Sequence, residues 1–342
     1  MGTVIELTNV WKVYRQVQRS AKLGEIFRNF VHPNLREVVA LRDVSLSVER
    51  GEVVAYAGPN GAGKSTTVKL LSGLLAPDRG RVRSLGMDPV RERARYVRRI
   101  GVVFGQRTEL WWDHPIAVSY EWKRVVWDVP RERFERTCGF VREVLGLDEF
   151  YTSLARELSL GQRMRADLGM ALLHEPELLL LDEPTLGLDV LAKRRILAFV
   201  KELNRERHLT VLVTSHDMQE LEQLAGRIVL VNRGEIAYDG DFDRLRRMHA
   251  VRRRILIETA DGPAPTLEGA ELVESQGSRH EYVYDAGAVR VSELLDQAAA
   301  QAQIVDVETH RAPIDEVIAD IYERWQEERA AERAESESRE AQ

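Results

Sequence analysis

The feature that most constrains this chain is the stretch Gly58–Thr66, which reads Gly-Pro-Asn-Gly-Ala-Gly-Lys-Ser-Thr. It matches the pattern of a glycine, four variable residues, a glycine, a lysine and a serine that cradles nucleotide phosphates. An apolar run at Val53–Ala57 predicts a buried strand before it, and Val68–Leu75 predicts a helix after it. Glycines let backbone N–H groups turn toward phosphate oxygens beside a helix N-terminus. The stretch therefore predicts a nucleotide triphosphate site, rather than an ordinary glycine-rich turn.

Two side chains of this stretch have specific expected roles. We expect Lys64 to reach the β- and γ-phosphates and the Ser65 hydroxyl to ligate Mg²⁺. The other residues expected to contact the nucleotide are Gly58, Pro59, Asn60, Gly61, Ala62, Gly63 and Thr66.

Composition narrows the setting in which such a site can work. The 342 residues are enough for about two domains, and 44% hydrophobic with 30% charged residues is ordinary for a soluble globular protein. A net charge of −6 disfavours nucleic acid as a partner. No apolar run approaches the roughly 20 residues needed to span a bilayer, and we expect no signal peptide. Any membrane part is therefore expected in another chain. The single cysteine, Cys138, excludes an internal disulfide and indicates a packing role.

Polar side chains follow three further apolar runs, each predicted to be a strand of an open α/β sheet. The three tips carry Gln106 after Ile100–Phe104, Asp182 and Glu183 after Leu178–Leu181, and His216 after Leu209–Thr214. Ligands bind at the carboxyl ends of such strands. We expect Asp182 to hold Mg²⁺ through its water shell and Glu183 to orient and deprotonate the attacking water. His216 is then expected to contact the γ-phosphate.

A second helix start, at Ser159 and Gly161, can also present donors to an anion, although a serine there is a common N-cap. Taken in order, the six motifs resemble the nucleotide-binding subunit of an ATP-binding-cassette (ABC) transporter over about residues 3–245. These motifs are Gly58–Thr66, Gln106, Ser159–Gln162, Leu178–Glu183, Asp189 and His216. The run Leu158–Arg165 and the tryptophan-rich segment after Gln106 are similar to a branch that serves ABC-2-type exporters.

The resemblance implies further roles and partners. Tyr14 would stack on adenine, and Gln106 would link the metal to a helical subdomain. Ser159, Gly161 and Gln162 of the signature would clamp the γ-phosphate bound by the opposite subunit, and Asp189 would contact that subunit's phosphate loop. Implied cofactors are ATP and Mg²⁺. Implied partners are a second copy, as a homodimer, and a separate transmembrane permease. The chain would then act at the cytoplasmic face of the cell membrane.

One residue departs from the family pattern. Leu160 stands where the usual signature has glycine, so its side chain must be directed away from the phosphate clamp. The alternative function is an ABC ATPase that acts on ribosomes or nucleic acid instead of in transport. The single phosphate loop and the lack of sustained heptads disfavour it.

The expected fold class is α/β, a P-loop NTPase of the ABC ATPase type with a helical signature subdomain and a small C-terminal α+β domain. The expected bounds are 1–245 for the ATPase domain, with an insert at 16–38 and the helical subdomain at about 107–175, and 250–326 for the C-terminal domain. Residues 327–342 are expected to form a disordered tail. Two alternatives stay open: the insert is either a surface helix or a membrane- or partner-binding segment, and the tryptophan-rich segment is either a helical core or a docking surface.

Overall fold

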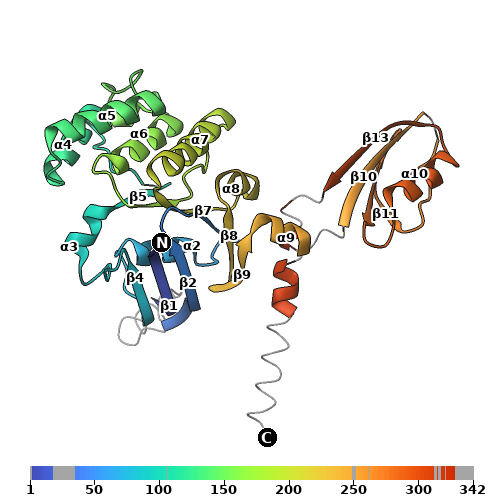
Figure 1. Ribbon diagram of the computed structural model, residues 1–342, viewed down its shortest axis with the longest axis horizontal. Coiled ribbons are helices and arrows are strands. Elements are labelled where there is room, and N and C mark those ends of the chain that lie inside the picture. Colours follow the sequence, from blue (N-terminus) through green and yellow to red (C-terminus); the bar gives the residue numbers. More distant parts are fainter. Residues whose placement is uncertain are drawn as a thin grey trace, which may run out of the picture. The chain divides into compact units, whose positions relative to one another are not determined.

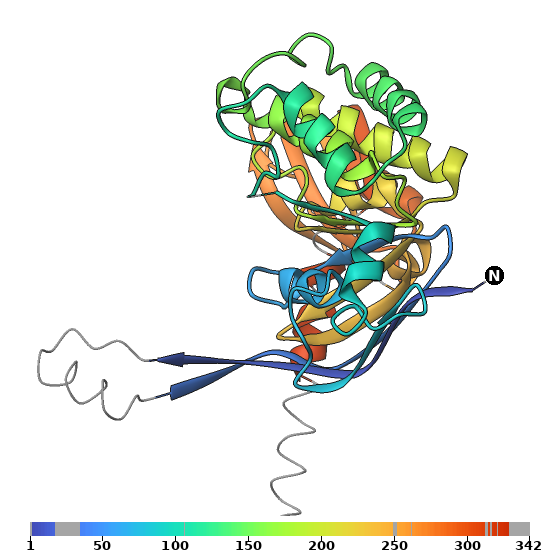
Figure 2. The same cartoon turned by 90° about the vertical axis from the view of Figure 1, so that its left-hand side faces the viewer.

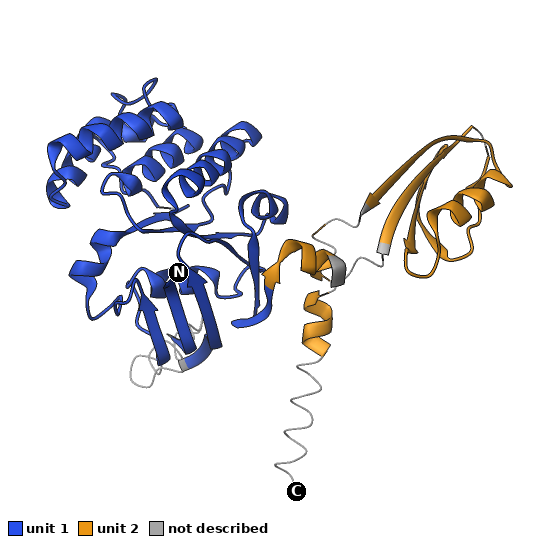
Figure 3. Cartoon of the chain, viewed as in Figure 1, with its two compact units in different colours: residues 1–239 blue, residues 240–342 orange. Residues whose placement is uncertain are grey.

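In the computed structural model the chain forms two compact units, residues 1–239 and 240–342 (Figure 3). The residues that the structure describes are 2–17, 35–105, 107–248, 252–260, 262–311, 314, 317–319 and 321–327. Gln106, most of the insert expected at 16–38 and most of the tail expected at 327–342 lie outside these residues.

A six-stranded sheet forms the centre of the first unit, in the order β5-β6-β7-β3-β8-β9 (Figure 1). Its strands are β3 (Val53–Ala57), β5 (Ile100–Phe104), β6 (Leu178–Asp182), β7 (Thr210–Ser215), β8 (Arg227–Asn232) and β9 (Glu235–Asp241). The first five strands in this order are parallel. Every residue of β6 is buried, which explains its uninterrupted leucines, because a parallel strand is covered on both faces. The parallel arrangement brings the tips of β3, β5, β6 and β7 to one edge.

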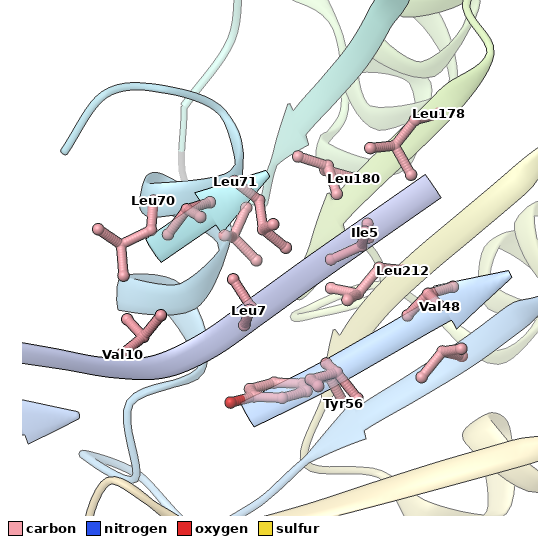
Figure 4. Packing of buried hydrophobic residues seen from close by; sticks show 14 of the residues in the cluster. Ile5, Leu7, Val10, Val48, Tyr56, Leu70, Leu71, Leu178, Leu180 and Leu212 are labelled. Atoms are coloured by element: carbon pink, nitrogen blue, oxygen red, sulfur yellow. The ribbon is translucent and has the colours of Figure 1, made fainter. Parts of the chain in front are cut away.

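A three-stranded antiparallel sheet packs against one face of the parallel sheet. Its order is β2-β1-β4, with β1 at Thr3–Val17, β2 at Leu35–Glu49 and β4 at Arg79–Ser84. The core between the sheets contains Ile5, Leu7 and Val48 from the antiparallel sheet and Tyr56 and Leu180 from the parallel sheet (Figure 4). Strands β1 and β2 remain paired from Thr3↔Glu49 to Val17↔Leu35 and extend beyond β4 (Figure 2). Residues expected at both ends of the insert thus belong to strands.

Helix α2 (Lys64–Leu71) begins four residues earlier than the sequence predicted. Its N-cap is Gly63, whose φ of 109° is accessible to glycine but not to residues with a Cβ atom. Lys64, Ser65 and Thr66 therefore lie in the first turn, where backbone N–H groups have no partner within the helix. Because the helix begins at Lys64, its N-terminus lies at the edge where the strand tips meet.

The helices of the first unit include a group on the other side of the parallel sheet (Figure 1). It contains α4 (Ile116–Val126), α5 (Arg131–Leu145), α6 (Leu160–Leu172) and α7 (Val190–Arg207), and the unit also has α3 (Arg93–Tyr96) and α8 (Met218–Leu224). Helices α4, α5 and α6 fall within the expected helical subdomain. Across the ranges that the structure describes, no helix has both the length and the apolar character that a membrane span requires.

The second unit has its own sheet and its own small core. After α9 (Phe242–Met248) come β10 (Arg252–Thr259), β11 (Ala270–Gln276), β12 (Arg279–Asp285), α10 (Val291–Ala299) and β13 (Ile304–Arg311). The strand order is β11-β12-β10-β13. Ile255, Ile257, Tyr282 and Leu294 are buried together in the core. Strands and a helix around a separate core are an α+β arrangement, in agreement with the expected class.

Candidate functional site

A cavity of about 530 Å³ opens at the edge where the strand tips meet. Residues Pro59–Thr66 form most of its wall, with Glu183 and His216 beside them. Ala40 and Leu186, which the sequence analysis did not single out, complete the lining. The first turn of α2, a lysine and a carboxylate therefore converge on one space large enough for a nucleotide.

Lys64 is held inside the phosphate loop by three oxygen contacts. Its ammonium group donates to the carbonyl oxygens of Gly58 at 2.7 Å and Pro59 at 3.4 Å, and it lies 3.4 Å from Oε1 of Glu183. The lysine is only 6% exposed. A buried cation needs such partners because desolvation is costly. A phosphate entering the loop can take over the role that Glu183 has here.

Ser65, Asp182 and Thr214 form a continuous set of oxygens beside the loop. The Ser65 hydroxyl donates to Oδ1 of Asp182 at 3.1 Å, and the Thr214 hydroxyl donates to the same oxygen at 2.8 Å. Thr214 was not expected from sequence, although it stands directly before the predicted tip of β7. The hydroxyl and carboxylate oxygens are hard donors of the kind Mg²⁺ prefers, and they come together from three elements, α2, β6 and β7.

Glu183 has an unusual backbone conformation at the tip of β6. Its φ is 54°, in the left-handed region that costs a residue other than glycine about 1 kcal/mol or more. Its backbone N–H donates to both oxygens of Thr214, at 3.1 Å each, which holds this conformation. The turn directs the side chain into the cavity, where Oε2 lies 2.8 Å from Nδ1 of His216. Strain of this kind is typical of functional sites.

The close approach of Gly105 to Glu183 leads to a first prediction. A Cβ atom at position 105 would lie 2.3 Å from the carbonyl oxygen of Glu183, so Gly105→Ala forces the strand tips apart. We expect it to lower the free energy of unfolding by about 1–3 kcal/mol, the usual cost of overpacking, and to lower kcat. Thermal unfolding and steady-state ATPase assays measure both effects.

Gly139→Ala is the matched control, because position 139 lies in helix α5 with no atom near the added methyl group. It should raise stability by roughly 0.5–1 kcal/mol through helix propensity and leave kcat unchanged. Equal effects of the two substitutions would refute the role given to the Gly105 contact.

The signature residues are not on the cavity wall. Among the described residues, none between 107 and 182 lines the cavity. Ser159 is the N-cap of α6, where its hydroxyl accepts from the Gln162 backbone at 3.2 Å and the Gln162 side chain accepts from the Ser159 N–H at 2.9 Å. This reciprocal capping box fixes the start of the helix.

Asp189 lies beside the signature, as the N-cap of α7. Its Oδ1 accepts from the backbone N–H groups of Leu191 and Ala192, at 2.9 Å each. The bond from Ala192, with a further contribution from Leu191, holds the pKa of the Asp189 carboxyl below its usual value. The side chain of Leu160 is directed toward Gly187: a Cβ atom added to Gly187 would lie 3.1 Å from Cδ2 of Leu160. The structure thus brings the signature together with Asp189 but not with the phosphate loop of the same chain.

Tyr14 lies at the margin of the cavity. It is on β1, paired with Val38, and its hydroxyl is 3.4 Å from that of Thr66 without lining the cavity. Gln106 cannot be placed, because it falls outside the described residues. Ala40, Leu186 and Thr214 carry no motif of their own. Thr214 is the last residue of the predicted run Leu209–Thr214, whereas Ala40 and Leu186 lie outside every run and motif named from the sequence.

Comparisons with known proteins agree with this geometry. The family model described as "ABC transporter" matches residues 41–186. The ABC transporter ATP-binding protein NatA of Bacillus subtilis (strain 168) is 33% identical over 208 residues, which cover 61% of this chain and 84% of that protein. The phosphonates import ATP-binding protein PhnC 2 of Synechococcus sp. (strain JA-2-3B'a(2-13)) is 34% identical over 257 residues, with coverage of 71% and 94%.

A solved structure extends the likeness to three dimensions. It is a dimeric ATP-binding cassette in a post-hydrolysis state, bound to ADP and Pi, and it is 25% identical to this chain with a TM-score of 0.58. The match covers 69% of this chain and 98% of the solved one. The α/β fold of the ABC ATPase type is thereby confirmed. The chain belongs to the family of ABC transporter ATP-binding proteins and is an ATPase.

Proposed function

We propose that two copies of the chain close head to tail around two ATP molecules, and that hydrolysis reopens the dimer to drive export through a separate transmembrane permease of the ABC-2 type. The observation that carries this proposal is the one-sided cavity. One chain supplies the phosphate loop, Glu183 and His216, while its own Ser159 and Gly161 line no part of that space. A second copy can supply the missing wall, and the solved relative bound to ADP and Pi is a dimer.

The surface around the signature has the character of an interface. Four apolar side chains near the starts of α6 and α7 are more than a third exposed: Leu160 (39%), Leu186 (37%), Val190 (63%) and Leu191 (67%). Apolar groups that gather around Gly161 and Asp189 are suited to burial against another protein surface. We assign this surface to the homodimer.

We propose Mg²⁺ as the metal of the site, held by Ser65 and Asp182 with Gln106 as a further ligand. The two described ligands fit the ion, since they present a hydroxyl and a carboxylate oxygen only 3.1 Å apart. When bound, the ion would neutralise charge on the phosphate oxygens. Thr214 keeps Asp182 oriented through its bond to Oδ1.

The other side chains of the cavity have roles that follow from their contacts. We assign Glu183 as the general base that orients and deprotonates the attacking water, and His216 as the group that holds the γ-phosphate and that water. Lys64 exchanges its Glu183 contact for the β- and γ-phosphates, which frees the carboxylate at the moment ATP binds. Tyr14 is proposed to stack on the adenine.

The permease is proposed to dock on a surface that we call the tryptophan surface: Trp111, Trp112, Val118, Trp122 and Val125. All five side chains are exposed, and the rings of Trp111 and Trp122 lie 5.1 Å apart. Exposed aromatic clusters of this kind mark protein interfaces. Export and the ABC-2 type rest on the resemblance of Leu158–Arg165 and of this segment to exporter subunits. Docking would place the chain at the cytoplasmic face of the cell membrane.

A pull-down tests this proposal. Tagged Glu183→Gln protein is recovered with ATP from gently solubilised native membranes, and its partners are identified by mass spectrometry. We expect a polytopic membrane protein, whose yield falls at least about tenfold in the Trp111→Ala/Trp122→Ala double variant, because aromatic anchors dominate interface energies.

Trp11→Ala is the control for the loss of a partly exposed tryptophan. Trp11 lies on β1 between the guanidinium groups of Arg42 and Arg79, away from the tryptophan surface. It should leave the yield unchanged. Recovery of ribosomes or nucleic acid in place of a membrane protein would reject the transport function and favour the alternative ATPase.

A further inference from the structure

Asp167 is a buried carboxyl that joins helix α6 to the segment following strand β5. It lies on α6 about two turns after Ser159 and is 7% exposed. Its Oδ1 accepts two hydrogen bonds, from the Thr108 hydroxyl at 2.8 Å and from the Glu109 backbone N–H at 3.0 Å. Within the described residues, no ion pair at this position compensates the carboxylate.

The segment that Asp167 holds is fixed at its other contacts as well. The Thr108 hydroxyl accepts from the Leu110 N–H at 3.1 Å, and the Trp111 N–H donates to the Ser119 hydroxyl at 3.0 Å. Glu109 pairs with Lys123 of helix α4 at 2.7 Å. Thr108–Leu110 therefore connects α6 to the tryptophan surface through defined bonds.

The same segment follows directly from the catalytic edge of the sheet. The Gly105 N–H donates to the carbonyl oxygen of Asp182 at 2.8 Å, and the Arg107 N–H donates to that of Phe104 at 3.0 Å. Contacts thus lead from the tip of β6 to the tip of β5, on to Thr108 and, through Asp167, to the helix that begins with Ser159.

The surroundings of Asp167 disfavour its charged form but satisfy one of its oxygens with two donors. Burial raises the pKa of its carboxyl to about 7, against the lowering effect of the bonds from Thr108 and Glu109. The charge of Glu109 raises this pKa further, that of Arg163 lowers it, and the Tyr120 hydroxyl lies nearby on α4. Both donors use one oxygen, so an asparagine amide can accept the same two bonds.

We propose that Asp167 is a positioning residue for ATP hydrolysis: it locks Thr108–Leu110 onto helix α6, so that Ser159 follows movements of the β5 tip. This proposal rests on the proposed role of Ser159 in closing the opposite subunit's site. Without the lock, the start of α6 would no longer be aligned with that site when the dimer closes, although the cavity of each chain would remain intact.

The experiment uses the full chain with three substitutions, Asp167→Leu, Asp167→Asn and Thr108→Val. ATP-dependent dimerisation is followed by light scattering in the Glu183→Gln background, and kcat and KM are measured with Glu183 intact. ADP affinity, measured by calorimetry, reports on the cavity of a single chain. Thr137→Val is the control, because Thr137 makes a similar 2.8 Å bond to Glu175 elsewhere in the helical region.

We expect Asp167→Leu to lower kcat about tenfold or more and to weaken dimerisation, with ADP affinity unchanged. A change of about tenfold is typical when the coupling between two sites is lost. Asp167→Asn should restore most of the activity, Thr108→Val should have an intermediate effect and Thr137→Val should have none. If Asp167→Leu does not fold, Thr108→Val decides the question in the same assays.

Two results would overturn the proposal: wild-type behaviour of Thr108→Val and Asp167→Leu, or equal losses of kcat and ADP affinity in every variant. Absence of ATP-dependent dimers in the Glu183→Gln parent is a different failure. It would reject the dimer of the proposed function before any variant of Asp167 is compared.

Discussion

Replacing Glu183 by glutamine is expected to abolish ATP turnover while leaving ATP binding intact. The amide keeps the size of the side chain and can still contact His216 and Lys64, which lie 2.8 and 3.4 Å from the carboxylate oxygens. It cannot accept a proton from water, and the loss of a general base typically lowers kcat by about 10²–10⁴-fold. Phosphate release under saturating ATP measures this effect. Because reopening requires hydrolysis, ATP-bound dimers should accumulate.

Glu177→Gln provides a control at the other end of β6. Glu177 precedes β6 at the opposite end from Glu183 and pairs with Arg99 and Arg50, away from the cavity. Its substitution should lower stability slightly and leave kcat unchanged. Turnover at the wild-type rate in Glu183→Gln would show that another group activates the water.

Replacing Lys64 by methionine is expected to remove most of the ATP affinity. Methionine fills the same volume but donates no hydrogen bond, so the phosphates lose their charged partner within the loop. Each charge-assisted hydrogen bond contributes about 1.5–3 kcal/mol, and two such bonds correspond to at least about a hundredfold weaker binding. Calorimetric titration with ATP measures the change. The free energy of unfolding should fall by less than the free energy of ATP binding, because removing the ammonium also removes the cost of burying a charge.

Lys12→Met separates the phosphate contact from the general loss of a lysine that is paired within the same unit. Lys12 is partly buried and lies outside the cavity; like Lys64, it contacts a carbonyl oxygen, that of Ala76 at 2.9 Å, and a carboxylate, that of Asp78 at 3.1 Å. Its variant should bind ATP normally. Equal affinity losses in both variants would indicate that unfolding, not the phosphate contact, explains the result.

The motifs of this chain predicted the fold class well because each one combines a residue pattern with a strand or helix end. Leu178–Asp182 is an example: five buried residues of a parallel strand need no partner-specific information to be recognised. The phosphate loop likewise contains its own glycines and its own lysine. Both features are local, and local sequence is sufficient to predict them.

Features that depend on contacts between distant segments were not predictable in this way. Thr214 orients Asp182 across two strands, and Ala40 reaches the cavity because β2 passes over the phosphate loop. The helix start at Lys64 was placed four residues late, because the sequence pattern does not show that Gly63 adopts a left-handed conformation as the cap. Asp167 is recognisable only once Thr108 is placed beside it.

The departure at Leu160 has a physical answer in the structure. A side chain at this position could have obstructed the phosphate clamp, but it is directed toward Gly187, whose missing Cβ leaves the necessary room. The capping box uses the N–H groups of Ser159 and Gln162, whereas those of Leu160 and Gly161 lie in the first turn and have no acceptor within the helix. Leucine adds exposed apolar area to the surface that we assign to the dimer.

The capping box at Ser159 has a consequence for the thermodynamics of association. Two reciprocal hydrogen bonds with Gln162 already order the start of α6 in the single chain. A flexible loop would lose conformational entropy on meeting its partner, at about 1–2 kcal/mol for each residue fixed. The start of α6 is ordered before the two subunits meet, so association is opposed mainly by their loss of translational and rotational entropy. A larger part of the binding energy of ATP is then left to bring the two subunits together.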